Sequence, residues 1–214
     1  MEAVGDGDDE RADLFPCLST PWPQLEPLLH FRLGQLIGIG MPDGSAEAAM
    51  GFALARHVAA EGTNVLVYAP HLPAGDPTPG LSHLRRPLTT AQRITDDVIS
   101  FAHTSRPVGL VVVDGFSQLH AEEGVRLSEP EQAEDAGRRL KRLADDLTVL
   151  VTVGLKRPQP ASRALQLSDL GLAAELIYHA DVLALLERTS PCNVDVLIAK
   201  DRLGPAPYKT SVPW

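Results

Sequence analysis

Six short apolar runs, separated by helical segments, constrain the fold of this chain more than any other feature. Continuous apolar runs without alternating polar residues are typical of strands buried on both faces of a sheet. We expect such strands at 35–40, 64–69, 108–113, 148–153, 181–186 and 194–199. Helices are expected at 45–61, 91–104, 131–146 and 168–178. This alternation predicts an α/β fold, in which a mostly parallel sheet carries helices on both faces.

Acidic residues and prolines mark the ends of the chain and the segments between elements. Residues 1–15 hold six acidic residues and one arginine, and we expect 1–14 to form a disordered acidic tail. Four prolines in 15–32 and five in 70–90 predict irregular loops, as does the proline-rich end after 199. The length of 214 residues suits one domain, which we place at 15–214.

The composition excludes several classes of protein. No apolar run approaches membrane-spanning length and no basic-then-apolar leader opens the sequence, so we expect a soluble, cytoplasmic protein that does not contact membranes. Cys17 and Cys192 are too few for a disulfide framework. The seven histidines lack the spacings typical of metal ligands, so we predict no protein-bound metal site of that kind. The net charge of −9 argues against nonspecific nucleic-acid binding by the whole surface.

The stretch 33–56 has the layout of a phosphate-binding loop. An apolar strand leads into a turn-forming segment with Gly40 and Gly44, and an alanine-rich helix follows at once. In such a loop the first helical N–H groups and the helix dipole face an anion. Gly40, Gly44 and Ser45 are therefore candidate contacts for a nucleotide, and the Ser45 hydroxyl is a candidate ligand of Mg²⁺.

The same stretch lacks the cation that such a loop needs. A lysine normally follows the last glycine and neutralises the β- and γ-phosphates of the nucleotide. Here Ser45, Ala46 and Glu47 follow, and the first lysine of the chain is Lys141. The site has the frame of a nucleotide site without its charge.

Asp114 is a second candidate, because it directly follows the apolar run 108–113. A carboxylate at the carboxyl end of a parallel strand lies beside the crevice where α/β proteins bind ligands. In phosphate-loop NTPases such an acid helps to hold Mg²⁺. The alternative is an aspartate that only caps the next turn.

Two basic groups of residues are further candidates. Lys200 and Arg202 follow the last strand two residues apart, so in an extended chain their side chains leave the same face, and together they suit binding of a phosphate. Residues 138–163 hold seven basic and two acidic residues. Their plain interpretation is a solvated helix face followed by a polar loop.

Taken in order, these motifs resemble the C-terminal, RecA-like motor domain of DnaB-type replicative DNA helicases. The resemblance covers roughly 20–205, and its ordered series is specific although no single piece is. The matching pieces are TPWPQLE (20–26), LGQL (33–36), NVLVYAPHL (64–72), LVVVDGFSQL (110–119), RRLKRLADDLTVLVTVGLKR (138–157), LSDL (167–170), ADVLALLER (180–188), and Lys200, Arg202 and Gly204.

The resemblance implies a RecA-like P-loop NTPase fold with ATP and Mg²⁺ as cofactors. It implies that Asp114, Lys200 and Arg202 are the candidate catalytic residues. It also implies that the basic loop 154–166 faces a central channel, so that Arg157 and Arg163 contact single-stranded DNA. The implied protein partners are further copies of the chain, in a homo-oligomer, or a subunit of a helicase.

The sequence departs from the family pattern mainly at the positions that bind nucleotide and catalyse its hydrolysis. The phosphate-loop lysine corresponds to Ala46 or Glu47, and the glutamate that activates water corresponds to His71. The glutamine after the fourth strand corresponds to Gly154, and a later glutamate corresponds to Ile177, whereas Asp181 is retained. Loss of the lysine and of the general base together predicts a large fall in hydrolysis rate, since each such group contributes ~10²–10⁴.

We therefore expect a DnaB-like protein with a degenerate nucleotide site, a non-catalytic accessory or regulatory protein linked to DNA replication or repair. Two alternatives stay open. One is an active ATP-dependent DNA helicase or translocase with an atypical phosphate loop. The other is a regulatory ATPase of the RecA/KaiC type, which predicts rings that respond to nucleotide.

Overall fold

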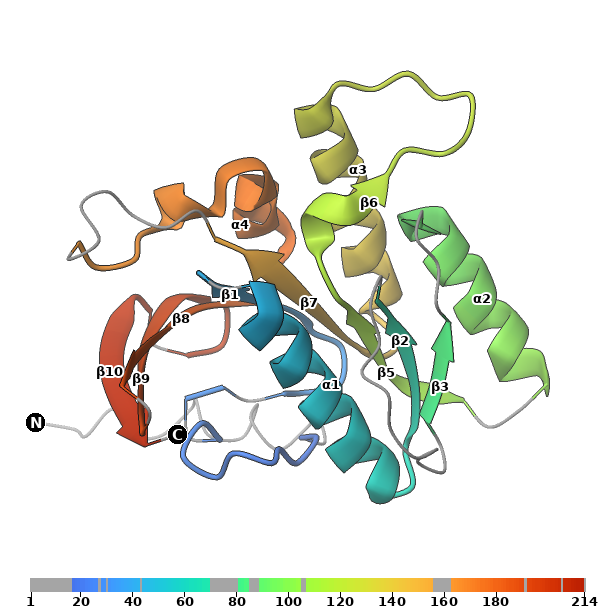
Figure 1. Cartoon of the computed structure of the whole chain (residues 1–214). Helices are drawn as coiled ribbons and strands as arrows, with labels where there is room; N and C mark the ends of the chain where they lie inside the picture. Colours follow the sequence, from blue (N-terminus) through green and yellow to red (C-terminus); the bar gives the residue numbers. More distant parts are fainter. Residues whose placement is uncertain are drawn as a thin grey trace, which may run out of the picture.

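An eight-stranded sheet runs through the whole molecule (Figure 1). The computed structural model describes residues 17–26, 28–29, 31–42, 44–69, 81–84, 89–104, 107–155, 163–190, 192–204 and 206–213. The predicted tail 1–14 lies outside this part of the chain. The sheet has the order β10-β9-β8-β1-β7-β5-β2-β3. Its strands are β1 (Leu36–Met41), β2 (Asn64–Tyr68), β3 (Leu81–Leu84), β5 (Val108–Val113), β7 (Thr148–Gly154), β8 (Val182–Ser190), β9 (Asn193–Asp201) and β10 (Tyr208–Pro213).

The centre of the sheet is parallel, and its middle strand is β1. β1 pairs in parallel with β7 on one side and with β8 on the other. β7, β5, β2 and β3 continue the parallel pairing, whereas β8 with β9 and β9 with β10 are antiparallel. All six residues of β1 are buried, as its continuous apolar run predicts. The predicted α/β class with a mostly parallel sheet is confirmed.

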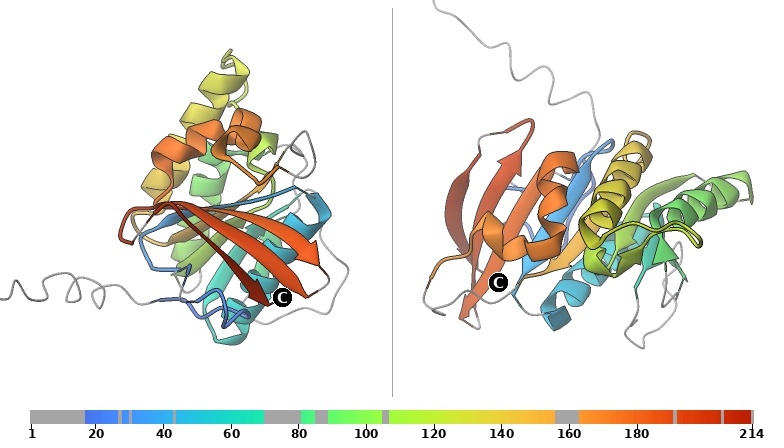
Figure 2. Two further views of the ribbon diagram at one scale, coloured as in Figure 1. Left: turned by 90° about the vertical axis from the view of Figure 1, so that its left-hand side faces the viewer. Right: turned by 90° about the horizontal axis from the view of Figure 1, so that it is seen from above.

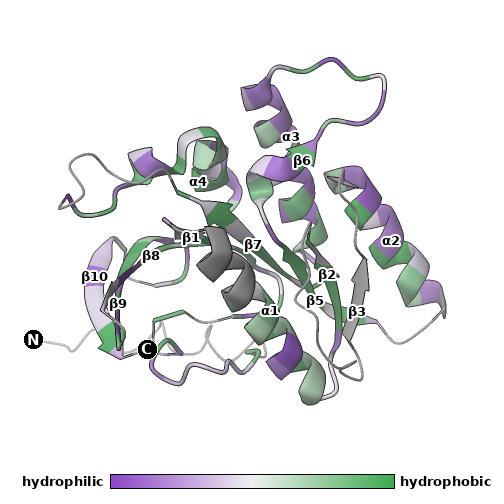
Figure 3. Cartoon of the chain, viewed as in Figure 1, coloured by the Kyte–Doolittle hydropathy of each residue, from purple (hydrophilic) through white to green (hydrophobic). Residues whose placement is uncertain are grey.

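Helices cover both faces of the sheet. α1 (Gly44–Ala60) packs on one face, together with the segment that contains Leu25, Leu29 and Phe31. α2 (Ala91–Thr104), α3 (Glu129–Leu143) and α4 (Leu176–His179) pack on the other face and lie side by side when seen from above (Figure 2). Hydrophobic residues are concentrated on the strands between these layers, while α2 and α3 carry hydrophilic residues (Figure 3).

Shorter elements complete the fold. β4 (Thr89–Thr90) and β6 (Leu119–His120) form a separate parallel pair. The 3₁₀ helices are η2 (Phe116–Gln118) and η3 (Leu167–Glu175), the second of which leads into α4. α3 begins two residues earlier than the predicted 131 because Ser128 caps it, and the Glu131 side chain bonds back to the Ser128 backbone.

The prediction of an uninterrupted loop over 70–90 is wrong. β3 and β4 lie within this range, and β3 pairs with β2 from Val65↔Leu81 to Tyr68↔Leu84. The five prolines in this range favoured the prediction of a loop, so both strands were missed. β3 has only four residues and lacks a long apolar run, so its strand conformation depends on pairing with the edge of β2 rather than on its own sequence pattern.

The end of the chain also differs from the prediction. β8 and β9 extend beyond 181–186 and 194–199 as one long antiparallel hairpin, and the proline-rich end contains β10. In β9, buried Val194, Val196 and Ile198 alternate with less buried residues. Such alternation is typical of an antiparallel strand with one face partly solvated, and a search for continuous apolar runs underestimates its length.

A buried carboxylate, Asp181, joins three elements just before β8. It is 5% exposed, and its Oδ2 accepts hydrogen bonds from the Leu36 backbone N–H and from Lys141 Nζ, each at 2.8 Å. Its Oδ1 lies 3.0 Å from Arg202 Nη1. Asp181 therefore fixes the start of β1, the end of α3 and the end of β9 relative to one another.

We predict that Asp181→Ala strongly destabilises the fold. The substitution leaves the Leu36 N–H and the Lys141 ammonium without their buried acceptor, which costs about 3–5 kcal/mol of unfolding free energy. Urea unfolding measures this loss. Asp145→Ala is the matched control, because Asp145 pairs with the same lysine at 3.5 Å but has a 65% exposed side chain, and its unfolding should stay near that of the unmodified chain. Equal losses in the two variants would contradict the assigned role of Asp181.

Candidate functional site

The carboxyl edge of the parallel sheet holds one group of predicted site residues. β1 ends at Met41 and α1 begins at Gly44, while Asp114 directly follows β5. β7 lies between β1 and β5, so Asp114 is two strand spacings, about 10 Å, from the end of β1. The fold therefore brings Gly44 and Asp114 to the same edge of the sheet.

Hydrogen bonds from the neighbouring strands hold Asp114. Its carboxylate Oδ1 accepts a hydrogen bond of 2.8 Å from the Thr152 hydroxyl on β7. The same hydroxyl accepts a hydrogen bond of 3.0 Å from the Gly115 N–H, and the Asp114 N–H donates to the Tyr68 carbonyl at the end of β2. Thr152 is 1% exposed. Asp114, directly after β5, is thus held to β2 by its backbone N–H and to β7 by its carboxylate.

Gly40 lies within β1 rather than in the turn that follows it. It pairs with Val153 of β7 and with Leu185 of β8. A Cβ atom at this position would lie 2.8 Å from the Leu155 Cδ2 and 3.0 Å from the Leu185 Cδ2. Close packing against these leucines explains why glycine stands here. The predicted turn beginning at Gly40 therefore starts later, after Met41.

The turn between β1 and α1 is short. Only residues 42 and 43 separate the end of β1 from Gly44, the first residue of α1. Gly44 thus stands at the helix N-terminus, the position from which backbone N–H groups face an anion. The side chains of Ser45, Ala46 and Glu47 lie outside the described part of the structure, as does His71.

Lys200 and Arg202 lie at the opposite, amino edge of the parallel strands. Because β9 runs antiparallel to β8, Lys200 stands opposite Leu183, close to the start of β8. The Lys200 Nζ donates a hydrogen bond of 2.6 Å to the Ile177 carbonyl in α4. Burial, with Arg202 and Lys141 nearby, lowers the pKa of Lys200, while Asp181 opposes the shift. Arg202 is 52% exposed in its side chain and pairs with Asp181.

The two edges are too far apart to form one site within this chain. β1 spans six residues, and its length from Leu36 to Met41 is about 17 Å. Lys200 and Arg202 therefore cannot reach an anion bound near Gly44 and Asp114 of the same chain. Any phosphate that these two cations contact belongs to another molecule or to another subunit.

Of the two arginines predicted to contact DNA, the structure describes only Arg163. Arg163 pairs through Nη2 with the nearly buried carboxylate of Asp169, and its Nη1 donates to the Ala164 carbonyl at 3.2 Å. Asp169 also accepts a hydrogen bond from the Gln166 N–H, which orders the start of η3. Arg157 lies outside the described residues. Arg163 thus has a structural role, and DNA contact by either arginine stays a prediction.

The structure describes two other positions at which the sequence departs from the family pattern, Gly154 and Ile177. Gly154 ends β7 at the carboxyl edge and pairs with Met41, so the position expected for a glutamine presents no side chain there. Ile177 lies in α4 at the amino edge, and its carbonyl accepts the Lys200 hydrogen bond. Ile177 therefore contacts Lys200 through its backbone.

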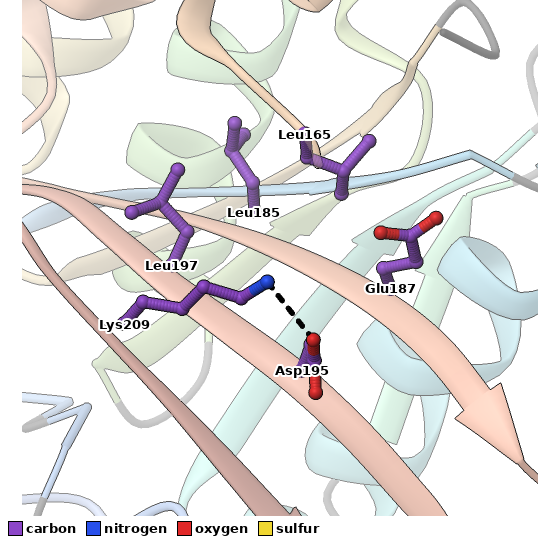
Figure 4. Close-up of a pocket in the computed structure, with 6 residues that line it drawn as sticks. All are labelled: Leu165, Leu185, Glu187, Asp195, Leu197 and Lys209. Carbon is purple, nitrogen blue, oxygen red and sulfur yellow. Dashed lines mark ion pairs between the residues drawn. The ribbon is translucent and has the colours of Figure 1, made fainter. Parts of the chain in front are cut away.

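A small cavity beside the β8–β9 hairpin is not a ligand site. Leu165, Leu185 and Leu197 line it, with the ion pair of Lys209 and Asp195 at 2.9 Å on one side (Figure 4). Its volume of about 10 Å³ is close to the minimum for one water molecule. Within the described ranges, no cluster of three or more His, Cys, Asp or Glu side chains could hold a metal ion. No helix in this part of the chain has the length and apolarity needed to span a membrane.

Comparison with solved structures relates the whole fold to helicase domains. The structure titled "ATPase Domain of G40P" matches with a TM-score of 0.75 at 17% identity, over 95% of this chain and 90% of that chain. "The Structure Of A DnaB-Like Replicative Helicase And Its Interactions With Primase" matches with a TM-score of 0.75 at 17% identity, over 97% of this chain. The match spans 62% of that helicase chain. No protein-family model and no curated protein matches the sequence.

These similarities establish the fold. The chain has the RecA-like architecture of DnaB-like helicase ATPase domains, as the ordered motifs predict. At 17% identity the similarity does not extend by itself to activity. What this chain can bind or catalyse therefore depends on its own residues.

We predict that the Thr152 hydroxyl is coupled energetically to Asp114. Thr152→Val keeps the shape of the side chain but removes the hydrogen bonds to Asp114 and Gly115, and it should lower the unfolding free energy by about 1–3 kcal/mol. A double-mutant cycle with Asp114→Ala, followed by urea unfolding, should give a coupling of about 0.5–3 kcal/mol. Strictly additive losses would show that the two side chains do not act as a unit.

Proposed function

We propose that this chain is a non-catalytic, DnaB-helicase-like protein that acts as an accessory or regulatory factor in DNA replication or repair. The observation that carries the proposal is the absence of any Lys or Arg in the sequence from 40 to 50. ATP brings about four negative charges, and hydrolysis depends on cations that neutralise the charge developing on the phosphates. Glu47 adds a further negative charge to the first turns of α1.

The local geometry supports the same conclusion. A Walker-type loop places four residues between its two glycines, so that several backbone N–H groups surround the phosphates. Three residues separate Gly40 and Gly44, and Gly40 belongs to β1. The remaining turn offers the N-terminus of α1 but little further backbone to enclose a triphosphate. Asp114 alone, already bonded to Thr152, does not supply the missing positive charge.

The amino edge supports docking to a helicase subunit. Arg202 there lies beside Leu203, which is 60% exposed, and Lys200 contacts the backbone of α4, where Tyr178 is 71% exposed. Exposed aromatic and apolar side chains next to arginine are typical of protein interfaces. A subunit that keeps this edge but has no working nucleotide site can contact an active neighbour without hydrolysing ATP itself. Single-stranded DNA, contacted through Arg157, is a further proposed partner.

The nucleotide prediction separates this proposal from an active motor. We expect no ATP binding by isothermal titration calorimetry at millimolar nucleotide with Mg²⁺, and no hydrolysis above background. Asp114→Ala should leave both readouts unchanged. Micromolar binding with hydrolysis that disappears in Asp114→Ala would instead establish an active helicase or translocase.

The docking prediction concerns the amino edge. Mixed with the replicative DnaB-type helicase of the same cell, the chain should co-migrate with it in size-exclusion chromatography. The double variant Tyr178→Asp, Leu203→Asp should lose this association because charges replace the exposed apolar contacts. Val125→Asp, at a site 50% exposed in the loop before α3, is the matched control and should still associate. Failure of the unmodified chain to associate, or equal association of the double variant, would refute docking through this edge.

A further inference from the structure

A groove lies between α2 and α3, away from Gly44, Asp114, Lys200 and Arg202. Its volume is about 460 Å³. Its floor consists of Val98, Val108, Leu143 and Leu147, which are between 3% and 9% exposed. Ile99 stands on its rim and is 52% exposed. The groove therefore presents an apolar floor to the solvent next to an exposed isoleucine.

The groove is elongated along α2. The residues of α2 that line it include Gln92, Thr95, Ile99 and Ala102, which recur every three or four residues and so share one face of the helix. The ten steps from Gln92 to Ala102 span about 15 Å along the helix axis. An apolar groove of this length between two helices is suited to a third helix of a few turns.

The polar groups around the groove fall into two sets. Gln92, Thr95 and Arg139 are engaged within the fold: Arg139 Nη1 donates to the Gln92 Oε1, Arg139 pairs with Asp135, and the Thr95 hydroxyl donates to the Ala91 carbonyl. Arg142, near the end of α3, and Asp146, in the turn that follows α3, form no ion pair with any residue that the structure describes. One cation and one anion thus remain at the rim for an incoming molecule.

We propose that this groove binds an amphipathic helix of a partner protein. The apolar stripe of that helix, with residues at positions i, i+3, i+4 and i+7, packs on the floor and on Ile99. An acidic residue beside the stripe faces Arg142, and a basic residue about one turn away faces Asp146. A small amphipathic anion fits less well, because it leaves Asp146 unpaired next to its own negative charge.

This inference goes beyond the proposed function and does not depend on it. The groove is lined by α2, α3 and the starts of β5 and β7, whereas helicase docking is assigned to Tyr178, Arg202 and Leu203. The two surfaces share no residue, so each can fail in its own experiment. A catalytically active chain could bind the same helix.

A phage-displayed library of helix-forming peptides tests the groove. The library randomises the stripe positions and the flanking charged positions, and selection uses the full chain. We expect enrichment of peptides with an apolar stripe, an acid and a base in the predicted order. Their affinity should fall by at least about tenfold on Ile99→Asp, as expected for loss of a central anchor. Selection against the double variant Arg142→Glu, Asp146→Lys should enrich the reversed charge order.

Matched controls and a competing ligand complete the test. Val125→Asp and Arg126→Glu, at exposed positions in the loop before α3, should leave peptide affinity unchanged, and circular dichroism checks that each variant is folded. Peptides that bind Ile99→Asp equally well, or a charge order that does not reverse, would overturn the proposal. Binding of sodium decanoate in the groove with no enriched peptide, or self-association of the chain that is lost on Ile99→Asp, would overturn it in favour of a lipid-like ligand or of a second copy.

Discussion

The parallel pairing of β1 with β7 and β8 is the constraint on which the other features depend. It places β1 in the middle of the sheet, with its start held by Asp181 and its end beside the turn into α1. Because parallel strands all point the same way, they separate the carboxyl edge from the amino edge by the length of a strand. The carboxylate of Asp114 stays at one edge, and the cations Lys200 and Arg202 stay at the other. Within one chain these charges therefore cannot contact the same bound anion.

Because no Lys or Arg lies between residues 40 and 50, the two edges of the sheet differ in what they can bind. The carboxyl edge of this chain has the N-terminus of α1, which favours an anion, but also the Asp114 carboxylate and Glu47 in the first turn of α1. These two negative charges oppose the binding of a triphosphate. The amino edge keeps a lysine, an arginine and exposed apolar side chains. We therefore propose that the chain contacts a neighbour rather than acting on its own nucleotide. The fold is that of DnaB-like helicase ATPase domains, and the accessory role is our proposal from the residues at the two edges.

Local sequence was sufficient for the elements whose environment is uniform. The runs at 108–113 and 148–153 consist mainly of apolar residues because β5 and β7 are buried on both faces, and their predicted bounds agree with the structure to within one residue. β3 and β10 were not predictable in this way, since each depends on pairing with the strand that precedes it in the chain, β2 or β9, rather than on an apolar run of its own. The prolines beside them indicate loops more strongly than the short strands indicate pairing.

In the candidate site, too, local sequence identified some residues, whereas others depend on contacts between strands. Asp114 was identifiable because a single carboxylate follows an apolar strand. Its partner Thr152 was not, because a β-branched residue inside a strand has an ordinary structural explanation, and only the packing of β5 against β7 brings the two side chains together. The contacts of Lys200 with backbone carbonyls of α4 leave no trace in the sequence either. Thr152 is one of two threonines in the otherwise apolar run 148–153, and these hydroxyls were the available signal.

The most direct test of the central claim is a crystal structure of the full chain grown with a non-hydrolysable ATP analogue and Mg²⁺. The account predicts no ordered triphosphate between the end of β1 and the start of α1, with the Asp114 carboxylate still bonded to Thr152. A triphosphate bound at the N-terminus of α1, with Mg²⁺ held by Ser45 and Asp114, would contradict the proposed loss of nucleotide binding. It would instead favour an active motor protein.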